Sequence, residues 1–324
     1  MRNRICKLIM LLCLSTLTFS SFADTAKEQK YVAITAIVEH PALDNVRRGV
    51  EDELKDNGYI NGENLKLQYA SAQGSSANAV QIAKQFAANK PDVIVGIATP
   101  SSQALLATTK RIPIIFTAVT DPVAARLTPS WEASKTNVTG VSDALPLDAQ
   151  IDMMLKIKPD AKNIGYVYSP SEVNSTIVLK QLQSALEKRG MQIIAAPAQR
   201  TSDISTAARS LKGKVDLIYT TTDNNVVSAY ESLAKVANES KIPLLASDPD
   251  SAERGAIAAL GMSYYDLGRQ AGKIVIRILN GEKPGDIPPQ IGNITQLTIN
   301  KKAAERQGVV LSEDVLKSAT KIVE

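Results

Sequence analysis

KPDVIVGIAT at residues 90–99 and KVDLIYTTTD at residues 214–223 are two copies of one pattern. Each copy begins with an apolar run typical of a buried strand and leads into a turn rich in Thr, Ser or Asn. Each then continues through helix-forming residues to a second apolar run that ends in Asp-Pro, at Asp121-Pro122 and at Asp248-Pro249. The repeated strand–helix–strand unit predicts two similar lobes with a cleft between them.

The repetition extends upstream, where an apolar run at 31–38 and an amphipathic segment at 44–57 match the pair at 163–169 and 175–189. Alternating strands and helices favour an α/β fold in which each lobe has an open, mostly parallel sheet flanked by helices. Irregular and proline-rich segments indicate three crossings between the lobes, near Gly140, Met262 and Pro288. We therefore expect residues 24–141 with 263–289 to form lobe 1, and residues 142–262 with 290–324 to form lobe 2. A helix is expected at 226–239, a last strand at 295–299 and a closing helix at 313–322.

The N-terminus has the pattern of a secretory signal peptide. Residues 1–7 are basic, residues 8–17 are apolar, and small residues occupy the two cleavage positions before Asp24. The apolar run is too short for a permanent transmembrane helix of about 20 residues, although a retained N-terminal anchor stays an alternative. Lipidation at Cys13 is disfavoured because no small residue directly precedes it. We expect residues 1–23 to be removed after Ala23 and the mature protein to be periplasmic.

Removal of the signal peptide would also remove both cysteines, Cys6 and Cys13, and with them disulfide and thiolate chemistry. Three of the 37 basic residues leave with it, and none of the 33 acidic residues does, so the remaining balance is nearly neutral. Such a balance gives no electrostatic case for binding nucleic acid or an anionic membrane.

The loops after the strands are the places to look for a ligand, because open α/β sheets bind ligands at the carboxyl ends of their strands. Thr99, Ser101 and Ser102 begin a predicted helix, and free backbone N–H groups beside hydroxyl groups suit a carboxylate. Asn174 and Ser175 follow a strand of lobe 2 and are candidates for the same role. Ordinary helix capping explains either group equally well.

Three aspartates, Asp121, Asp223 and Asp248, end strands or turns at matching places in the repeat and are candidates to hold an ammonium group. The alternative is turn chemistry, in which each carboxylate binds its own backbone. With their polar neighbours, the candidate ligand-binding residues are Glu39, His40, Thr99, Ser101, Ser102, Thr120, Asp121, Asn174, Ser175, Thr222, Asp223, Asn224 and Asp248.

His40 is the only histidine, and Glu39 stands beside it after the first strand. A general base is conceivable there, but a lone imidazole in a loop is more often a polar pocket wall. The sequence has no nucleophile elbow, no G-x-G-x-x-G fingerprint, no P-loop and no cluster of metal ligands. We therefore expect no enzyme activity, no cofactor and no metal.

Several runs, in this order along the chain, resemble the ABC-transporter substrate-binding family that includes the tryptophan- and tyrosine-type binding components. They are GYINGEN from Gly58, KPDVIV from Lys90, IPIIF from Ile112, TDPV from Thr120, NVTG from Asn137 and TINKKAAERQG from Thr298. The resemblance implies the type I periplasmic binding protein fold and a small-molecule ligand, an aromatic amino acid such as Phe, Tyr or Trp. It also implies delivery to an ABC permease with its ATPase, by a protein that acts as a monomer.

Two other functions stay open at this point. A sugar is the second choice of ligand, but sugar sites stack rings on aromatic faces, and only Phe86, Phe116 and Trp131 supply such faces beyond the signal peptide apart from the tyrosines. A binding protein that serves a membrane receptor instead of a permease would have the same sequence features. A LacI-like regulator is disfavoured because the chain begins with an export signal and not with a helix-turn-helix.

Overall fold

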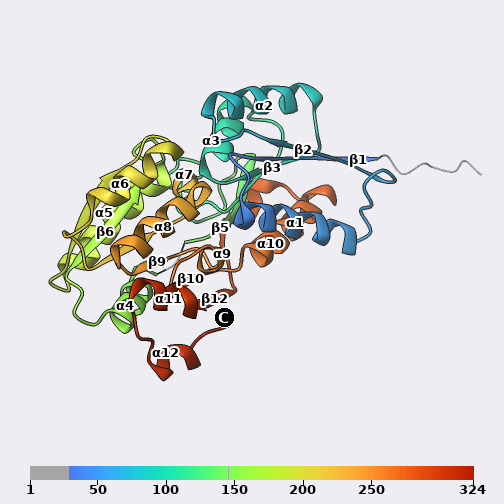
Figure 1. Cartoon of the computed structure of the whole chain (residues 1–324). Coiled ribbons are helices and arrows are strands. Elements are labelled where there is room, and N and C mark those ends of the chain that lie inside the picture. Colours follow the sequence, from blue (N-terminus) through green and yellow to red (C-terminus); the bar gives the residue numbers. More distant parts are fainter. Residues whose placement is uncertain (1–28, 145) are drawn as a thin grey trace, which may run out of the picture.

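The computed structural model describes residues 29–144 and 146–324, and the predicted signal peptide lies outside these residues. The chain forms two α/β lobes, each built on its own sheet (Figure 1). The sheet of lobe 1 has the strand order β11-β5-β4-β3-β1-β2, and all its ladders are parallel. Its strands are β1 (Lys30–Ala36), β2 (Leu65–Ser71), β3 (Val93–Ile97), β4 (Ile114–Thr117), β5 (Val138–Ser142) and β11 (Gln290–Ile291).

Helices cover both faces of this first sheet (Figure 1). Helices α2 (Ser76–Asn89) and α3 (Thr99–Thr108) lie on one face, and α1 (Pro41–Asp56) and α10 (Tyr264–Leu279) lie on the other. The short helix η2 (Pro284–Asp286) precedes β11. Strands β3 and β4 are buried along their whole length, as expected of parallel strands covered on both sides.

The sheet of lobe 2 has the order β13-β12-β10-β9-β8-β6-β7. Strand β12 runs antiparallel to β10, and the other described ladders of this sheet are parallel. Its strands are β6 (Asn163–Tyr168), β7 (Gln192–Pro197), β8 (Leu217–Thr220), β9 (Leu244–Ala246), β10 (Ala258–Met262), β12 (Thr295–Asn300) and β13 (Lys321–Val323).

The helices of lobe 2 also divide between two hydrophobic cores, one on each face of the sheet. One core takes α4 (Leu147–Ile157), α5 (Val173–Glu187), α11 (Lys301–Gln307) and α12 (Glu313–Lys317). The other takes α6 (Ile204–Ser210), which follows η1 (Thr201–Asp203), with α7 (Asn224–Ser228), α8 (Tyr230–Ser240) and α9 (Asp250–Glu253). No helix in the described ranges is both long and apolar enough to span a bilayer.

Close packing of α1 against α10 ties a late segment of the chain into lobe 1. A Cβ on Gly49 would lie 2.2 Å from the carbonyl oxygen of Tyr265, and one on Gly268 would lie 2.1 Å from that of Val46. The two helix backbones can approach this closely only because both positions are glycine. Helix α10 thereby becomes part of the core of lobe 1 although it follows β10 of lobe 2 in the sequence.

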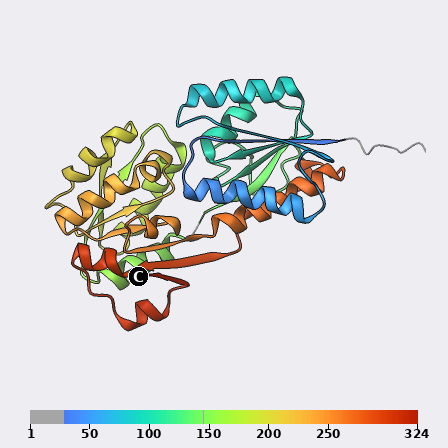
Figure 2. The ribbon, with the colours of Figure 1, turned by 45° about the vertical axis from the view of Figure 1, so that its right-hand side comes forward.

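The chain passes between the lobes after β5, at Ser263 and after β11 (Figure 2). Backbone hydrogen bonds join these passages, from Gly292 N–H to the Ser142 carbonyl at 2.8 Å and from Ser263 N–H to the Ile294 carbonyl at 2.9 Å. Three neighbouring connections of this kind form a hinge. We use the term hinge for residues 142–144, 146–147, 262–264 and 291–295.

Several predicted elements differ from the structure. The segment at 313–322 is not one helix, because α12 ends at Lys317 and residues 321–323 pair with the free edge of β12. The predicted helix at 226–239 is two helices, α7 and α8, which meet at Ala229. Residues 138–142 form a full strand of the first sheet, so the passage to lobe 2 follows Ser142. Strand β11 adds Gln290–Ile291 to that same sheet.

Candidate ligand-binding site between the lobes

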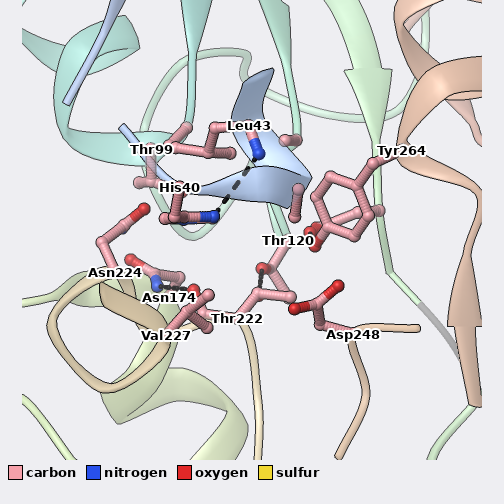
Figure 3. A pocket seen from close by; sticks show the side chains of 14 residues that line it. His40, Leu43, Thr99, Thr120, Asn174, Thr222, Asn224, Val227, Asp248 and Tyr264 are labelled. Carbon is pink, nitrogen blue, oxygen red and sulfur yellow. Dashed lines mark hydrogen bonds between the residues drawn. The ribbon is translucent and has the colours of Figure 1, made fainter. Parts of the chain in front are cut away.

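A pocket of about 320 Å³, part of it open to solvent, lies between the lobes (Figure 3). Lobe 1, the hinge and lobe 2 all contribute to its wall. Its lining residues are His40, Ala42, Leu43, Ala98, Thr99, Ala118, Thr120, Asp143, Asn174, Thr222, Asn224, Val227, Asp248 and Tyr264. No lysine or arginine is among these described residues, so any positive charge in the pocket must come from a ligand.

The start of α3 forms the part of the wall that is richest in hydrogen-bond donors. Strand β3 ends at Ile97, Ala98 turns the chain, and α3 begins at the buried residue Thr99. The first backbone N–H groups of a helix have no partner within it, and the helix dipole favours a negative group at this end. A carboxylate fits this place, as the sequence predicts for Thr99.

Two alanines of the wall have backbone angles that alanine seldom adopts. Ala98 has φ 73° and ψ 159°, in a region that is almost restricted to glycine, and Ala118 has φ 53°. Such conformations cost about 1–3 kcal/mol each and cluster at functional sites. Both alanines follow a strand directly, where the backbone must turn to bring the next residues to the pocket.

His40 lines the pocket as a neutral imidazole. It caps α1, and its Nδ1 accepts the N–H of Leu43 at 3.5 Å. Burial, together with the charge of Arg254, lowers the pKa of His40 to about 3. The ring proton is therefore on Nε2 at neutral pH, where it can be donated to a ligand. A neutral donor suits the pocket wall that the sequence favours for this residue.

Asp143 and Tyr264 bring the hinge into the pocket. The Tyr264 hydroxyl donates to Asp143 Oδ2 at 2.8 Å, whereas Asp143 Oδ1 has no hydrogen-bond partner among the described residues. Asp143 is only 7% exposed, and burial raises the pKa of its carboxyl. Neither residue was among the predicted site residues; Asp143 was missed because residues 138–142 were taken for a linker. Recognising that segment as a strand would have placed Asp143 at a strand's carboxyl end.

Asn174 offers a second acceptor without a partner. It is 5% exposed, and its Nδ2 donates to the backbone carbonyl of Thr222 at 3.1 Å. Its Oδ1 has no partner within the described part of the chain. A buried polar atom without a hydrogen bond is costly unless a ligand or water satisfies it.

The three predicted aspartates have different surroundings. Asp248 lines the pocket, and burial, with the nearby charge of Asp250, raises its pKa to about 7. Asp223 is fully buried behind the wall and accepts four hydrogen bonds, from the N–H and hydroxyl of Ser169, the Ser175 hydroxyl and the Val226 N–H. Asp121 accepts from two backbone N–H groups of its own turn and lines an adjoining cavity.

The structure brings together most, but not all, of the predicted site residues. His40, Thr99, Thr120, Asn174, Thr222, Asn224 and Asp248 line the pocket. Behind the wall lie Ser101, Ser102, Ser175 and Asp223; the Ser102 hydroxyl donates to the carbonyl groups of Gly96 and Ala98. Glu39 is exposed and accepts from Gln73 Nε2 at 3.2 Å, outside the pocket. The side chains of Glu39, Ser102, Ser175 and Asp223 are used by the fold's own hydrogen bonds. The buried Ser101 hydroxyl has no hydrogen-bond partner among the described residues.

A larger cavity adjoins the pocket and shares Thr120, Asp143 and Thr222 with it. We call it the side cavity; the space between its walls is about 610 Å³, part of which is open solvent. Its other walls combine apolar, aromatic and amide side chains, among them Trp131, Leu147, Gln150, Val178, Gln181 and Tyr219. The Tyr219 hydroxyl donates to Gln150 Oε1 at 2.9 Å. The side cavity can therefore take a large side chain that extends from a group bound in the pocket.

Two solved structures resemble the whole of the described chain. A Streptococcus pneumonia ABC domain in complex with L-Trp matches with a TM-score of 0.87 at 32% identity, over 91% of this chain and all of that one. A ligand-free, open substrate-binding protein of Clostridium difficile matches with only 0.70, at 36% identity over 91% of this chain and 99% of the other. The present structure thus superposes better on the L-Trp complex than on the ligand-free, open relative.

The sequence comparisons agree with the fold. The family model for ABC transporter substrate-binding proteins matches residues 31–323. A tyrosine-binding protein of Clostridioides difficile is 41% identical over 295 residues, which cover 90% of this chain and 85% of the relative. The predicted type I periplasmic binding protein fold is confirmed, with two lobes on mostly parallel sheets. The chain belongs to the family of ABC transporter substrate-binding proteins.

Proposed function

We propose that this protein binds a free aromatic α-amino acid between its lobes and delivers it to an ABC importer. The observation that carries the proposal is the pair of buried acceptor oxygens, Asp143 Oδ1 and Asn174 Oδ1, which lack a donor among the described residues. An ammonium group supplies three donors and a positive charge. It would satisfy acceptors of this kind in a pocket without lysine or arginine.

The carboxylate of an amino acid also finds hydrogen-bond donors in the pocket. Thr99 stands at the start of α3, and the Nε2–H of His40 is free to donate to the pocket. Helix N-termini and neutral imidazole donors bind carboxylates without a formal positive charge. A zwitterion therefore meets donors for its carboxylate and acceptors for its ammonium in one pocket.

The preference for an aromatic side chain rests on the side cavity and on the relatives. Trp131 and Tyr219 line the cavity together with apolar residues, and Gln150 and Gln181 offer polar groups to a hydroxyl or an indole N–H. Aromatic rings gain both buried area and ring–ring contacts in such surroundings. Two of the relatives described above are a tyrosine-binding protein and an ABC domain in complex with L-Trp.

The remaining parts of the proposal follow from the family. A substrate-binding protein of this kind acts outside the cytoplasm with a permease and its ATPase. For this chain we propose cleavage after Ala23, residence in the periplasm and a monomeric state. Intact-mass analysis of exported protein would test the cleavage site, and an acylated Cys13 at the N-terminus would contradict it.

Calorimetry of the purified protein against the twenty amino acids and a panel of sugars tests the ligand. We expect tight binding of tyrosine, tryptophan or phenylalanine and no heat from sugars. Binding of a sugar alone would refute the proposal. Binding of small aliphatic amino acids alone would keep the zwitterion site but contradict the aromatic preference.

A further inference from the structure

Glu172 is a buried carboxylate that lies behind the pocket and does not line it. It precedes α5 and is 8% exposed. One of its oxygens, Oε2, accepts three hydrogen bonds: from Asn174 Nδ2 at 3.0 Å, from Asn224 Nδ2 at 2.7 Å and from the Asn224 backbone N–H at 3.1 Å. The two amides that it holds both line the pocket.

An ionised carboxylate can only accept hydrogen bonds, so an amide bound to it must present its NH₂ group. The carbonyl oxygen of the same amide then points the other way. Figure 3 shows the Asn224 oxygen on the side of the pocket that His40 lines. The orientation of Asn174 has a second support in the Thr222 carbonyl, whereas the Asn224 amide has no other acceptor in the described residues.

We propose that Glu172 is a positioning residue that turns the carbonyl oxygens of Asn174 and Asn224 toward the ligand, so that the pocket selects an ammonium group. The inference rests on the proposed function, because it concerns how the site recognises one end of an amino acid. Without the carboxylate, the Asn224 amide can rotate by half a turn and present donors, which an ammonium group cannot use.

The ionisation of Glu172 gives this role a pH signature. Burial, together with the negative charge of Asp223, raises the pKa of Glu172 to about 7. Tyr166 from β6 also faces this group, but burial keeps its pKa well above the neutral range. The residues of β1, α2 and α3 that line the cavity beside Glu172 carry no ionisable side chain. His40, across the pocket, is neutral.

The sign of the effect follows from the charge of the ligand. A bound ammonium group favours the ionised form of Glu172, so affinity should rise with pH up to the free-state pKa of about 7. Asp248 lines the pocket and has a pKa raised to about 7 as well, so it contributes a slope of the same sign. Asp143, whose pKa is also raised by burial, lines the pocket as well and contributes to the slope in every variant. The contribution of Glu172 is therefore the difference in slope between Asp248→Asn and Asp248→Asn/Glu172→Gln.

The experiment measures affinity for L-tyrosine and L-tryptophan, and for 3-(4-hydroxyphenyl)propionate, which lacks the ammonium group. Titrations of the full-length mature protein run between about pH 5.5 and pH 8.5. In the Asp248→Asn background, Glu172→Gln should lower amino-acid affinity about ten-fold at high pH, equivalent to about 1.4 kcal/mol. It should also flatten the pH profile and leave the affinity for the propionate within about two-fold.

A double-mutant cycle shows whether Glu172 acts through Asn224. Asn224→Ala should weaken amino-acid binding, and adding Glu172→Gln should then cause little further loss, because coupled residues are not additive. Additive losses, or an unchanged affinity and pH profile in Glu172→Gln, would overturn the role given to Glu172 but leave the proposed function intact. If the wild type binds no amino acid, the proposed function and this inference both fail. If Glu172→Gln does not fold, a flat pH profile in Asp248→Asn overturns the inference by itself.

Discussion

Two buried aspartates, Asp223 and Asp143, show that a buried carboxylate near the cleft is not always available to a ligand. The carboxylate of Asp223 accepts four hydrogen bonds from the fold itself. These bonds link the loops after β6 and β8 to the starts of α5 and α7. Asp143 keeps one oxygen free, directed at a pocket without a cation of its own. The number of donors that the fold supplies decides which carboxylate remains available.

Asp143→Asn should weaken binding of the amino acid by at least about 30-fold. The change removes the charge and one acceptor from a buried charged hydrogen bond, which costs on the order of 2–5 kcal/mol. Calorimetry with the wild-type ligand measures the loss. The matched control is Glu39→Gln, which removes an exposed carboxylate outside the pocket and should change affinity by less than about two-fold. Equal effects of the two variants would contradict the role given to Asp143.

The sequence predicted the location of the site better than its individual contacts. Thr99, Thr120, Thr222, Asn224 and Asp248 reach the pocket because they follow strands whose carboxyl ends meet at the cleft. The sequence cannot show which of these polar side chains will form hydrogen bonds with a neighbouring loop, since the donors come from other segments. The Ser175 hydroxyl donates to Asp223, which lies 48 positions further along the chain, and no local sequence pattern predicts that hydrogen bond.

At the scale of the element, the start of α3 combines a strained residue with a site for an anion. Ala98 has glycine-like backbone angles, which its Cβ opposes, and it occupies the turn between β3 and the helix. The neighbouring loop has a similar residue in Ala118. The chain keeps alanine at both positions, and the Cβ atoms of the two residues contribute to the pocket wall.

Ala98→Gly should raise stability by roughly 1 kcal/mol, because glycine adopts a positive φ at no steric cost. The unfolding midpoint should rise by roughly 2–4 °C, as measured by calorimetry. Ala104→Gly, in the middle of the same helix, is the control and should lower stability by about 1 kcal/mol or more. A lower midpoint in both variants would show that Ala98 is not strained.

Short elements were the hardest to predict. The break between α7 and α8 comes at Ala229, a residue with high helix propensity, so its cause is tertiary. Likewise, β13 has only three residues and gains its hydrogen bonds from the exposed edge of β12. Long periodic segments such as α1 and α5 were predicted to within a few residues, because burial of one face decides them.

At the scale of the molecule, the lobes stand close together and a few polar contacts span the gap. The hydroxyl groups of Thr120 and Thr222 lie 3.2 Å apart, and Asn45 Nδ2 donates to Asp250 Oδ2 at 2.9 Å. Two hydrogen bonds are worth about 1–3 kcal/mol, which is small enough for thermal opening. A ligand that touches both lobes and the hinge would add to this closing energy.

Small-angle X-ray scattering should therefore show a smaller radius of gyration with the amino acid than without it. The ligand-free protein samples open forms, and the ligand selects the closed form because only there do both lobes contact it. The same measurement with a sugar that does not bind serves as the control. An identical profile with and without a ligand of proven binding would argue against hinge closure.

Stability of the ligand-free protein should fall as pH rises through the neutral range. The pKa values of Glu172 and Asp248 are raised to about 7 from the ordinary values of 4.5 and 3.8 for these side chains. Between those limits the folded state binds more protons than the unfolded state, so the free energy of unfolding decreases with pH. Thermal unfolding between about pH 5 and pH 8 measures the slope, and the Glu172→Gln/Asp248→Asn protein should show a smaller one. A slope that survives in that protein would assign the effect to other groups.

The three passages through the hinge also govern the order in which the chain can fold. Lobe 1 needs α10 and β11, which end at Ile291, and lobe 2 needs β12 and β13, which end at Val323. A chain that emerges from the ribosome, or from a translocation channel, with its N-terminus first can finish neither core until almost its whole length has come through. The interleaved connectivity thus delays stable folding during synthesis. A chain that stays unfolded in this way can still pass through a translocation channel.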